Sequence, residues 1–206
     1  MKKITLFMIC IIMALSCFGC SSSNLGDISL ETGETGLYIK DGIVSYGMKE
    51  SFDKDYYNKD DLEEAVNSEI EEYNSGELAG SEDAVTVSKL KIKSKEAYLV
   101  LEFASFSDYV NYVVNYEQVS EEEIFLGTLA DANETFVVDC QFVSVSDGQT
   151  VSDSDILENE EYNILIINGQ TKVQIDGGAE YMSDNCSIDD EIITTADGEM
   201  SYIIFQ

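Results

Sequence analysis

Four lysines at alternating positions form the most distinctive chemical pattern in the chain. Lys89, Lys91, Lys93 and Lys95 would line one face of a regular β-strand. Such a stripe could bind an anionic polymer such as teichoic acid. It could equally belong to a solvent-facing strand whose lysines pair with neighbouring Glu or guard a sheet edge. The edge interpretation is favoured, because Lys commonly protects exposed strand edges.

Clusters of carboxylates are a second group of residues able to do chemistry. Hard cations need several converging oxygen ligands, and paired carboxylates can hydrolyse glycosides. No cluster has the spacing of an EF-hand loop, so each is most simply a solvated turn. If folding makes a structural calcium site, we expect it at Asp184, Asp189, Asp190 and Glu191. With 41 acidic residues, a pair at hydrolytic distance arises by chance and does not predict an enzyme.

Two cysteines lie far from the N-terminus, Cys140 and Cys186. An exported protein can join such a pair in a disulfide. Cys140, however, falls in an apolar pattern that is typical of a buried free thiol, so both states remain open. Neither thiol is expected to be a nucleophile, because the chain has no His to lower a thiol pKa.

The composition excludes several classes of function. The chain has 206 residues and a net charge of −30, and all its basic residues are Lys. Without His and Arg there is no Ser-His-Asp triad, no imidazole zinc site and no bidentate phosphate clamp. Nucleic acid is a poor partner for so acidic a chain. We therefore expect no catalytic residue and no cofactor apart from the calcium considered above. The acidity itself is most simply a device for solubility, although it could attract divalent cations or a cationic partner.

The N-terminus has the pattern of an export signal. Lys2 and Lys3 precede an apolar run over residues 4–15, which is too short to span a membrane comfortably and is typical of a signal peptide. Gly19 and Cys20, followed by three serines, resemble a bacterial lipobox. In a lipobox the signal peptidase cuts before the Cys, whose thiol carries a diacylglyceryl group.

Lipidation at Cys20 would place the protein on the outer face of the cell membrane. Cys17 is the alternative lipid acceptor, and an ordinary secretory signal is the alternative to a lipobox. The fit is imperfect, since Cys17 and Phe18 stand where Leu and Ala or Ser are usual. We expect a signal peptide over residues 1–19, and a lipidated Cys with a flexible tether over residues 20–35.

Hydrophobic periodicity predicts an α+β fold for residues 36–130. The order is that of the split β-α-β pattern of ferredoxin-like folds, an antiparallel sheet with both helices on one face. A bulge near Ser88 is expected, because the apolar phase of its strand slips there. The expected elements are a hairpin (37–40 and 43–48), a helix (60–73), two strands (84–93 and 97–103), a helix (105–116) and a strand (124–126).

Residues 131–206 are predicted to be rich in β-structure. They form either a small barrel or sandwich, or an extension of the first sheet. The boundary near residue 130 is soft, so a single continuous domain remains open. The expected elements are strands at 135–145, 162–167, 172–176, 179–183, 191–195 and 201–205, a helical turn at 153–157 and a hairpin turn at Asn168-Gly169.

One resemblance extends these inferences. The segments FDKDYYNKDDLEEAVNSEIEEYN, SFSDYVNY, FLGTL and YMSDN resemble uncharacterised small lipoproteins of Gram-positive anaerobic bacteria. The resemblance implies a lipid-anchored exported domain and brings no catalytic motif.

The sequence therefore predicts a membrane-anchored, extracytoplasmic lipoprotein that acts as a non-catalytic binding or envelope-assembly module. Its expected partners are the membrane, through the lipid, and a cationic or envelope protein. The alternatives are an accessory solute- or polymer-binding lipoprotein and, behind it, a carboxylate-dependent hydrolase. The oligomeric state is not predicted.

Overall fold

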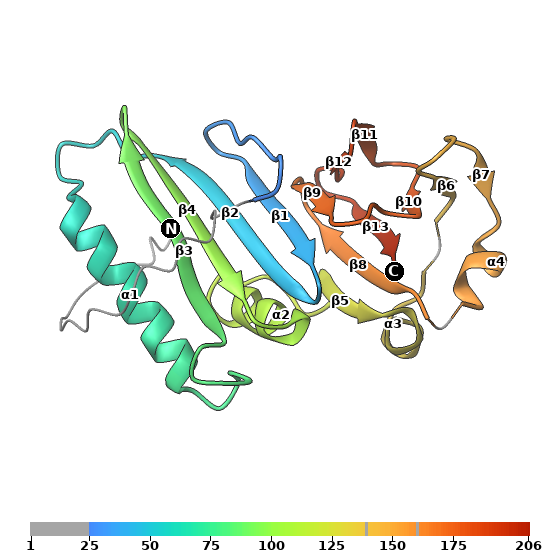
Figure 1. The fold of residues 1–206 in the computed structure, drawn as a ribbon, viewed down its shortest axis with the longest axis horizontal. Coiled ribbons are helices and arrows are strands. Elements are labelled where there is room, and N and C mark those ends of the chain that lie inside the picture. The colour runs from blue at the N-terminus through green and yellow to red at the C-terminus, as the bar shows by residue number, and fades with distance from the viewer. Residues whose placement is uncertain (1–24, 139, 160) are drawn as a thin grey trace.

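The computed structural model describes residues 25–138, 140–159 and 161–206 (Figure 1). It confirms an α+β fold. The helices are α1 (Lys59–Ser75), α2 (Phe106–Asn115), α3 (Leu129–Thr135) and α4 (Asp153–Leu157).

The strands form two sheets. The seven-stranded sheet has the order β11-β12-β9-β1-β2-β4-β3, and the six-stranded sheet has the order β5-β8-β13-β10-β6-β7. The seven strands are β1 (Thr35–Lys40), β2 (Ile43–Ser51), β3 (Val85–Lys93), β4 (Glu96–Phe103), β9 (Lys172–Ile175), β11 (Ser187–Asp189) and β12 (Ile192–Thr194). The six strands are β5 (Ile124–Thr128), β6 (Phe142–Ser144), β7 (Thr150–Val151), β8 (Asn163–Asn168), β10 (Tyr181–Ser183) and β13 (Met200–Phe205).

The two main helices begin and end at local signals. The side chain of Asn58 caps α1 by accepting a hydrogen bond from the Asp60 backbone N–H, so the helix begins at Lys59, one residue before the expected start. The hydroxyl of Ser105 caps α2 by accepting a hydrogen bond from the Asp108 N–H, and this helix begins at Phe106. These caps fix where the helices start relative to the strands before them.

The ferredoxin-like arrangement is not confirmed. β4 does lie between β2 and β3 in antiparallel pairs, as that fold requires. The other side of β2, however, is taken by β1, because a two-residue turn at Asp41-Gly42 leaves β1 next to β2. β5, which would occupy that place, pairs with β8 in the second sheet instead.

The last third of the chain departs from its prediction at two places. The long strand expected at 135–145 is wrong: residues up to Thr135 belong to α3, and only Phe142–Ser144 form a strand. The hairpin expected at Asn168-Gly169 is also wrong, because β8 and β9 lie in different sheets. Thr195 holds this turn instead, since its hydroxyl donates to the Gly169 carbonyl and accepts from the Thr171 N–H.

The two predicted parts of the chain share one sheet and one core. β9 pairs in parallel with β1, so the segment that carries β9, β11 and β12 extends the first sheet. A single apolar cluster contains Leu37 and Phe103 from the first part and Leu165 and Ile203 from the second. The parts before and after residue 130 are therefore joined through a common sheet and a common core.

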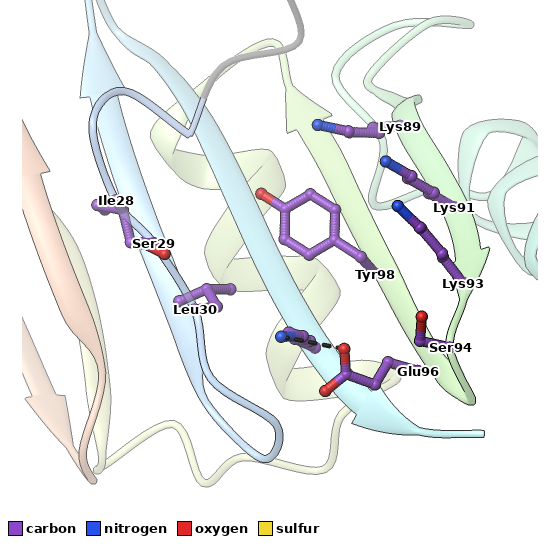
Figure 2. A pocket seen from close by; sticks show the side chains of 10 residues that line it. Ile28, Ser29, Leu30, Lys89, Lys91, Lys93, Ser94, Glu96 and Tyr98 are labelled. Carbon is purple, nitrogen blue, oxygen red and sulfur yellow. Dashed lines mark ion pairs between the residues drawn. The ribbon is translucent and has the colours of Figure 1, made fainter. Parts of the chain in front are cut away.

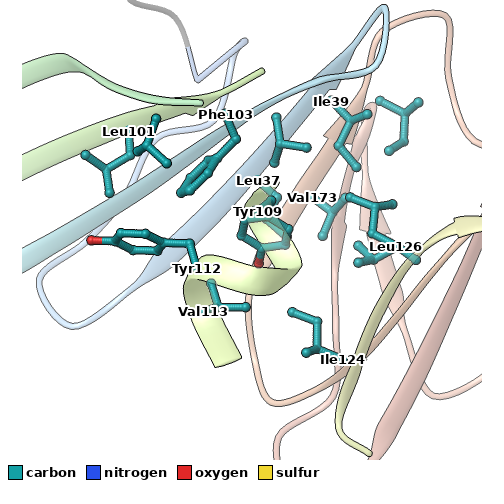
Figure 3. Packing of buried hydrophobic residues seen from close by; sticks show 14 of the residues in the cluster. Leu37, Ile39, Leu101, Phe103, Tyr109, Tyr112, Val113, Ile124, Leu126 and Val173 are labelled. Carbon is teal, nitrogen blue, oxygen red and sulfur yellow. The ribbon is translucent and has the colours of Figure 1, made fainter. Parts of the chain in front are cut away.

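Helices cover one face of the seven-stranded sheet. Tyr109 and Tyr112 of α2 contact Phe103 of β4, with ring centroids 5.4 and 5.2 Å apart (Figure 3). Tyr73 of α1 meets Tyr112 at 5.5 Å. These rings are buried and tilted edge-on to one another, an arrangement that aromatic pairs prefer.

The segment before β1 covers part of the opposite face. Gly36 and Gly47 are directly opposed in the β1–β2 pair, and their missing side chains leave a hollow. Leu25, Ile28 and Leu30 fill this hollow and are buried. The prediction of a flexible tether through residue 35 is therefore wrong from Leu25 onward, because these apolar side chains find a packing surface that the local sequence does not reveal.

Candidate functional site: a lysine-lined groove

A groove runs along the uncovered part of the seven-stranded sheet. Its volume is about 450 Å³. Figure 2 shows Lys89, Lys91 and Lys93 projecting in the same direction from β3, with Tyr98 of β4 lying between them and the opposite wall. The lining residues are Ile28, Ser29, Leu30, Lys49, Lys89, Lys91, Lys93, Ser94, Glu96 and Tyr98.

A β-bulge sets the direction of the lysines. The register between β3 and β4 shifts between Val87 and Lys89, as the change of apolar phase predicts. Before the bulge, the Val87 side chain packs on the face of the sheet that α1 and α2 cover. After the bulge, strand alternation places the Leu90 and Ile92 side chains on this same face. The extra residue thereby places Lys89, Lys91 and Lys93 on the face opposite to the one that α1 and α2 cover.

The wall of the groove is held by contacts from β9. The Lys172 ammonium donates to the Ser29 carbonyl at 2.9 Å and to the Glu34 carboxylate at 2.7 Å. The side-chain oxygen of Gln174 accepts from the Asp27 N–H at 2.7 Å. The hydrogen bond from Lys172 lowers the pKa of the Glu34 carboxyl. Residues more than a hundred positions apart thus build this wall.

The lysines of the chain fall into two groups. Five of the described lysines form ion pairs, namely Lys40 with Asp176, Lys49 with Glu96, Lys54 with Asp53, Lys59 with Glu63 and Lys172 with Glu34. Lys89, Lys91, Lys93 and Lys95 have no carboxylate partner within 4.0 Å among the described residues. The expectation that neighbouring Glu neutralises the stripe is therefore wrong.

The stripe does lie on a sheet edge, because β3 is the last strand of its sheet. Edge protection alone does not need a groove, and adjacent like charges on one strand repel one another. An anion in the groove would relieve this repulsion. The groove therefore keeps open the anion-binding alternative that the sequence places beside the favoured edge interpretation.

The floor of the groove is polar, with its own charges already paired. Glu96 accepts hydrogen bonds from the Thr32 hydroxyl and the Lys49 ammonium, and these two donors, Thr32 first, lower the pKa of its carboxyl. Its negative charge is thereby directed to Lys49 and away from β3. Burial raises the pKa of the Tyr98 phenol, which stays neutral and can donate a hydrogen bond. The Lys89 ammonium lies 4.9 Å from the centre of the Tyr98 ring.

The expected calcium site gains no support. Asp189 ends β11, and Asp190 and Glu191 form the turn before β12. No group of three or more Asp, Glu, Cys or His side chains able to hold a metal occurs within residues 25–138, 140–159 and 161–206. The calcium site therefore stays a prediction.

The predicted cysteine sites have different outcomes. No disulfide joins Cys140 to Cys186 in the structure, so the bridge left open by the sequence is not formed there. The Cys186 thiol hydrogen-bonds Ser183 and Asn185 beside β10. Cys20, the expected lipid acceptor, lies outside the described residues.

A hydrolytic site would need a carboxylate of raised pKa in a cleft. The pKa of the Glu117 carboxyl is raised by desolvation and, second, by nearby Glu69, but Glu117 does not line the groove. Among the described residues, Glu96 is the only carboxylate in the groove lining, and it is paired. Two further cavities, of about 150 and 90 Å³, fall below the roughly 300 Å³ of typical small-molecule pockets.

Sequence reasoning found the lysines and missed the rest of the groove. Lys49 reaches it from β2, which pairs with β4 and not with the next strand in the chain, and Ile28–Leu30 lie in the expected tether. The two glycines inside strands, Gly36 and Gly47, were the available signal, because a strand glycine often marks a close approach by other atoms.

Among the described residues, none of the helices is long and apolar enough to cross a membrane. Comparison of the chain with protein-family models, curated proteins and solved structures finds no match.

Proposed function

We propose that the protein is a membrane-anchored, extracytoplasmic binding module without catalytic activity, whose groove binds an anionic partner. The anchor is the lipid expected on Cys20. One observation supports the binding proposal most strongly. The chain has 41 acidic residues, yet four lysines at alternating positions have no carboxylate partner among the described residues, and three of these lysines line one groove.

The spacing of the lysines suits a ligand with repeated negative charges. Residues two apart on a strand are separated by about 7 Å, so the three ammonium groups form a short row. Lys acts as a mobile point charge with three donors and does not demand one fixed acceptor geometry. Tyr98 adds a neutral donor beside the row. This combination favours binding of phosphates or carboxylates in series.

The alternatives from the sequence gain less support. A solute-binding lipoprotein would enclose its ligand, whereas the groove formed by the described residues is open along a sheet face. A carboxylate-dependent hydrolase needs two carboxylates around the substrate, and the lining formed by residues that the structure describes contributes one, Glu96. The acidic surface elsewhere retains its simplest interpretation, which is solubility and repulsion from other anionic surfaces.

The binding proposal is tested with inorganic polyphosphate as the probe. The full-length protein in a neutral detergent should bind polyphosphate by calorimetry, more weakly as salt is added. Replacing Lys89, Lys91 and Lys93 with Gln should weaken binding about a hundredfold, if each lysine contributes on the order of 1 kcal/mol.

The matched control is the triple variant Lys40→Gln, Lys54→Gln and Lys59→Gln, which removes the same charge from paired lysines. It should bind almost as the parent does. Equal losses in both triple variants, or no binding by the parent, would contradict the proposal.

The anchor is tested separately by mass spectrometry of the N-terminal peptide. A diacylglyceryl group on Cys20 is the expected result. A Cys20→Ala protein that still fractionates with membranes would count against this part of the proposal.

A further inference from the structure

We infer that the anionic partner of the groove is the headgroup layer of the membrane that holds the anchor, so that the domain docks with its lysine face on the lipid. The inference rests on the proposed function, since it needs both the anchor at Cys20 and an anion-binding groove. Three observations lead to it: where the described chain begins, how the charge is distributed, and the open form of the groove.

The described chain begins on the lysine face. Leu25 lies over Gly47, on the side of the sheet that carries the groove, and is 3% exposed. Ile28 and Leu30, a few residues later, form the groove wall. Leu25 follows Cys20 by five residues, which reach at most about 18 Å even when fully extended. A lipid on Cys20 therefore keeps this face close to the bilayer.

The charge distribution favours the same orientation. A domain of strongly negative net charge is repelled by an anionic leaflet, but screening confines each contribution to about 8 Å at physiological salt. Only charges at the contacting face then matter. Two acids beside the groove are paired, Glu96 with Lys49 and Glu34 with Lys172. Asp27 and Glu31 of the covering segment are exposed, and Glu102 lies at the far end of β4 from Glu96.

The lysines of β3 remain available at this face, and basic residues close to an anionic leaflet are attracted to it. Lys95 lies in the turn between β3 and β4, outside the groove lining. An open row on an exposed sheet face can meet many headgroups at once, while a closed pocket would admit one. The anchor also holds the headgroups at high effective concentration, an advantage that a free polymer lacks.

The chain contains no Trp, so a single introduced Trp reports its own surroundings. Ser29→Trp places the reporter in the groove wall, where the Ser29 side chain is exposed and only its carbonyl is engaged, by Lys172. Asn67→Trp is the matched control, at an exposed position of α1 on the helix side of the sheet. The full-length lipidated proteins are reconstituted in vesicles that contain a headgroup spin-labelled quencher.

The measured quantity is the extra quenching that phosphatidylglycerol causes when it replaces part of the phosphatidylcholine. We expect this extra quenching for Ser29→Trp and not for Asn67→Trp. It should be lost at high salt and when Lys89, Lys91 and Lys93 are replaced with Gln in the same chain. The comparison between lipids removes the quenching that the tether alone produces.

Two results would overturn the inference, and only the first of them is compatible with the proposed function. If phosphatidylglycerol has no effect while polyphosphate binding still depends on the three lysines, the proposed function stands and its ligand is a polymer in solution. If neither the phosphatidylglycerol effect nor polyphosphate binding depends on these lysines, the proposed function is contradicted as well.

Discussion

The two faces of the seven-stranded sheet are closed in different ways. On one face α1 and α2 bury an aromatic cluster built around Tyr73, Phe103 and Tyr109. On the other, the segment from Leu25 covers β1 and β2 and leaves the β3–β4 edge open to form the groove. Apolar packing dominates the first face, and ion pairs and hydrogen bonds to a covering segment shape the second. The comparison suggests that stability and binding are divided between the two faces.

Removing a core ring should give the largest effect on stability. Tyr109 is 2% exposed, and Tyr109→Ala should lower the free energy of unfolding by about 3–5 kcal/mol, as for other large aromatic truncations. Tyr56→Ala, at a side chain 78% exposed, should change it by less than about 0.5 kcal/mol. Denaturant titration measures both values.

The same Tyr109→Ala protein should still bind polyphosphate at temperatures where it is folded. Loss of binding in the folded variant would contradict the division between the faces.

Filling the glycine hollow should have a smaller effect, confined to the groove side. A Cβ at Gly47 would lie 2.5 Å from Leu25 Cδ2, so Gly47→Val must displace the covering segment. We expect a loss of roughly 1–3 kcal/mol, as for other overpacked sites. Limited proteolysis should then cut the segment before β1, and polyphosphate should bind more weakly because the wall is lost.

Thr86→Val is the control for this change, since it introduces the same side chain on an exposed position of the same sheet. It should leave both the proteolysis pattern and the binding unchanged. If protease cuts the covering segment equally slowly in Gly47→Val and in the parent, packing of Leu25 against Gly47 does not fix the segment to the sheet.

Acidification should have the smallest effect, which is a loss of the stabilisation that ionised Glu34 and Glu96 give to the covering segment. The pKa values of Glu34 and Glu96 are lowered, chiefly by hydrogen bonds from Lys172 and from Thr32, below the ordinary Glu value of 4.5. A carboxyl of lowered pKa stabilises the folded state above its unfolded pKa, and this contribution disappears as the pH falls through the folded value.

The melting temperature of the parent should therefore exceed that of a Glu34→Gln, Glu96→Gln variant near neutral pH. The difference should vanish as the pH falls from 4.5 through the lowered values. A difference that persists in acid would mean that the ionised carboxylates do not stabilise the segment.

The parts of the fold that local patterns determine were predictable. Helical spacing located α1 and α2, the Asp41-Gly42 turn located the first hairpin, and a slip in apolar phase located the bulge near Ser88. Each of these features depends on residues within one element or on two adjoining elements, so the sequence pattern records it directly.

The errors share a different cause. The parallel pair of β1 with β9 and the move of β5 to the second sheet depend on partners far away in the chain. The burial of Leu25 depends on a hollow made by two glycines on other strands. Alternation along one strand cannot reveal such partners, which is why the stripe was predicted while the groove, its wall and its unpaired charges were not.

The central claim is that the lysines of β3 bind anions while the ion-paired lysines do not. Lysine acylation followed by mass spectrometry tests it within one molecule, without substitutions, by comparing the full-length protein with and without polyphosphate. We predict that polyphosphate slows modification of Lys89, Lys91 and Lys93 and leaves Lys54 and Lys59 unchanged. Uniform slowing across all these lysines, or none on β3, would contradict the account.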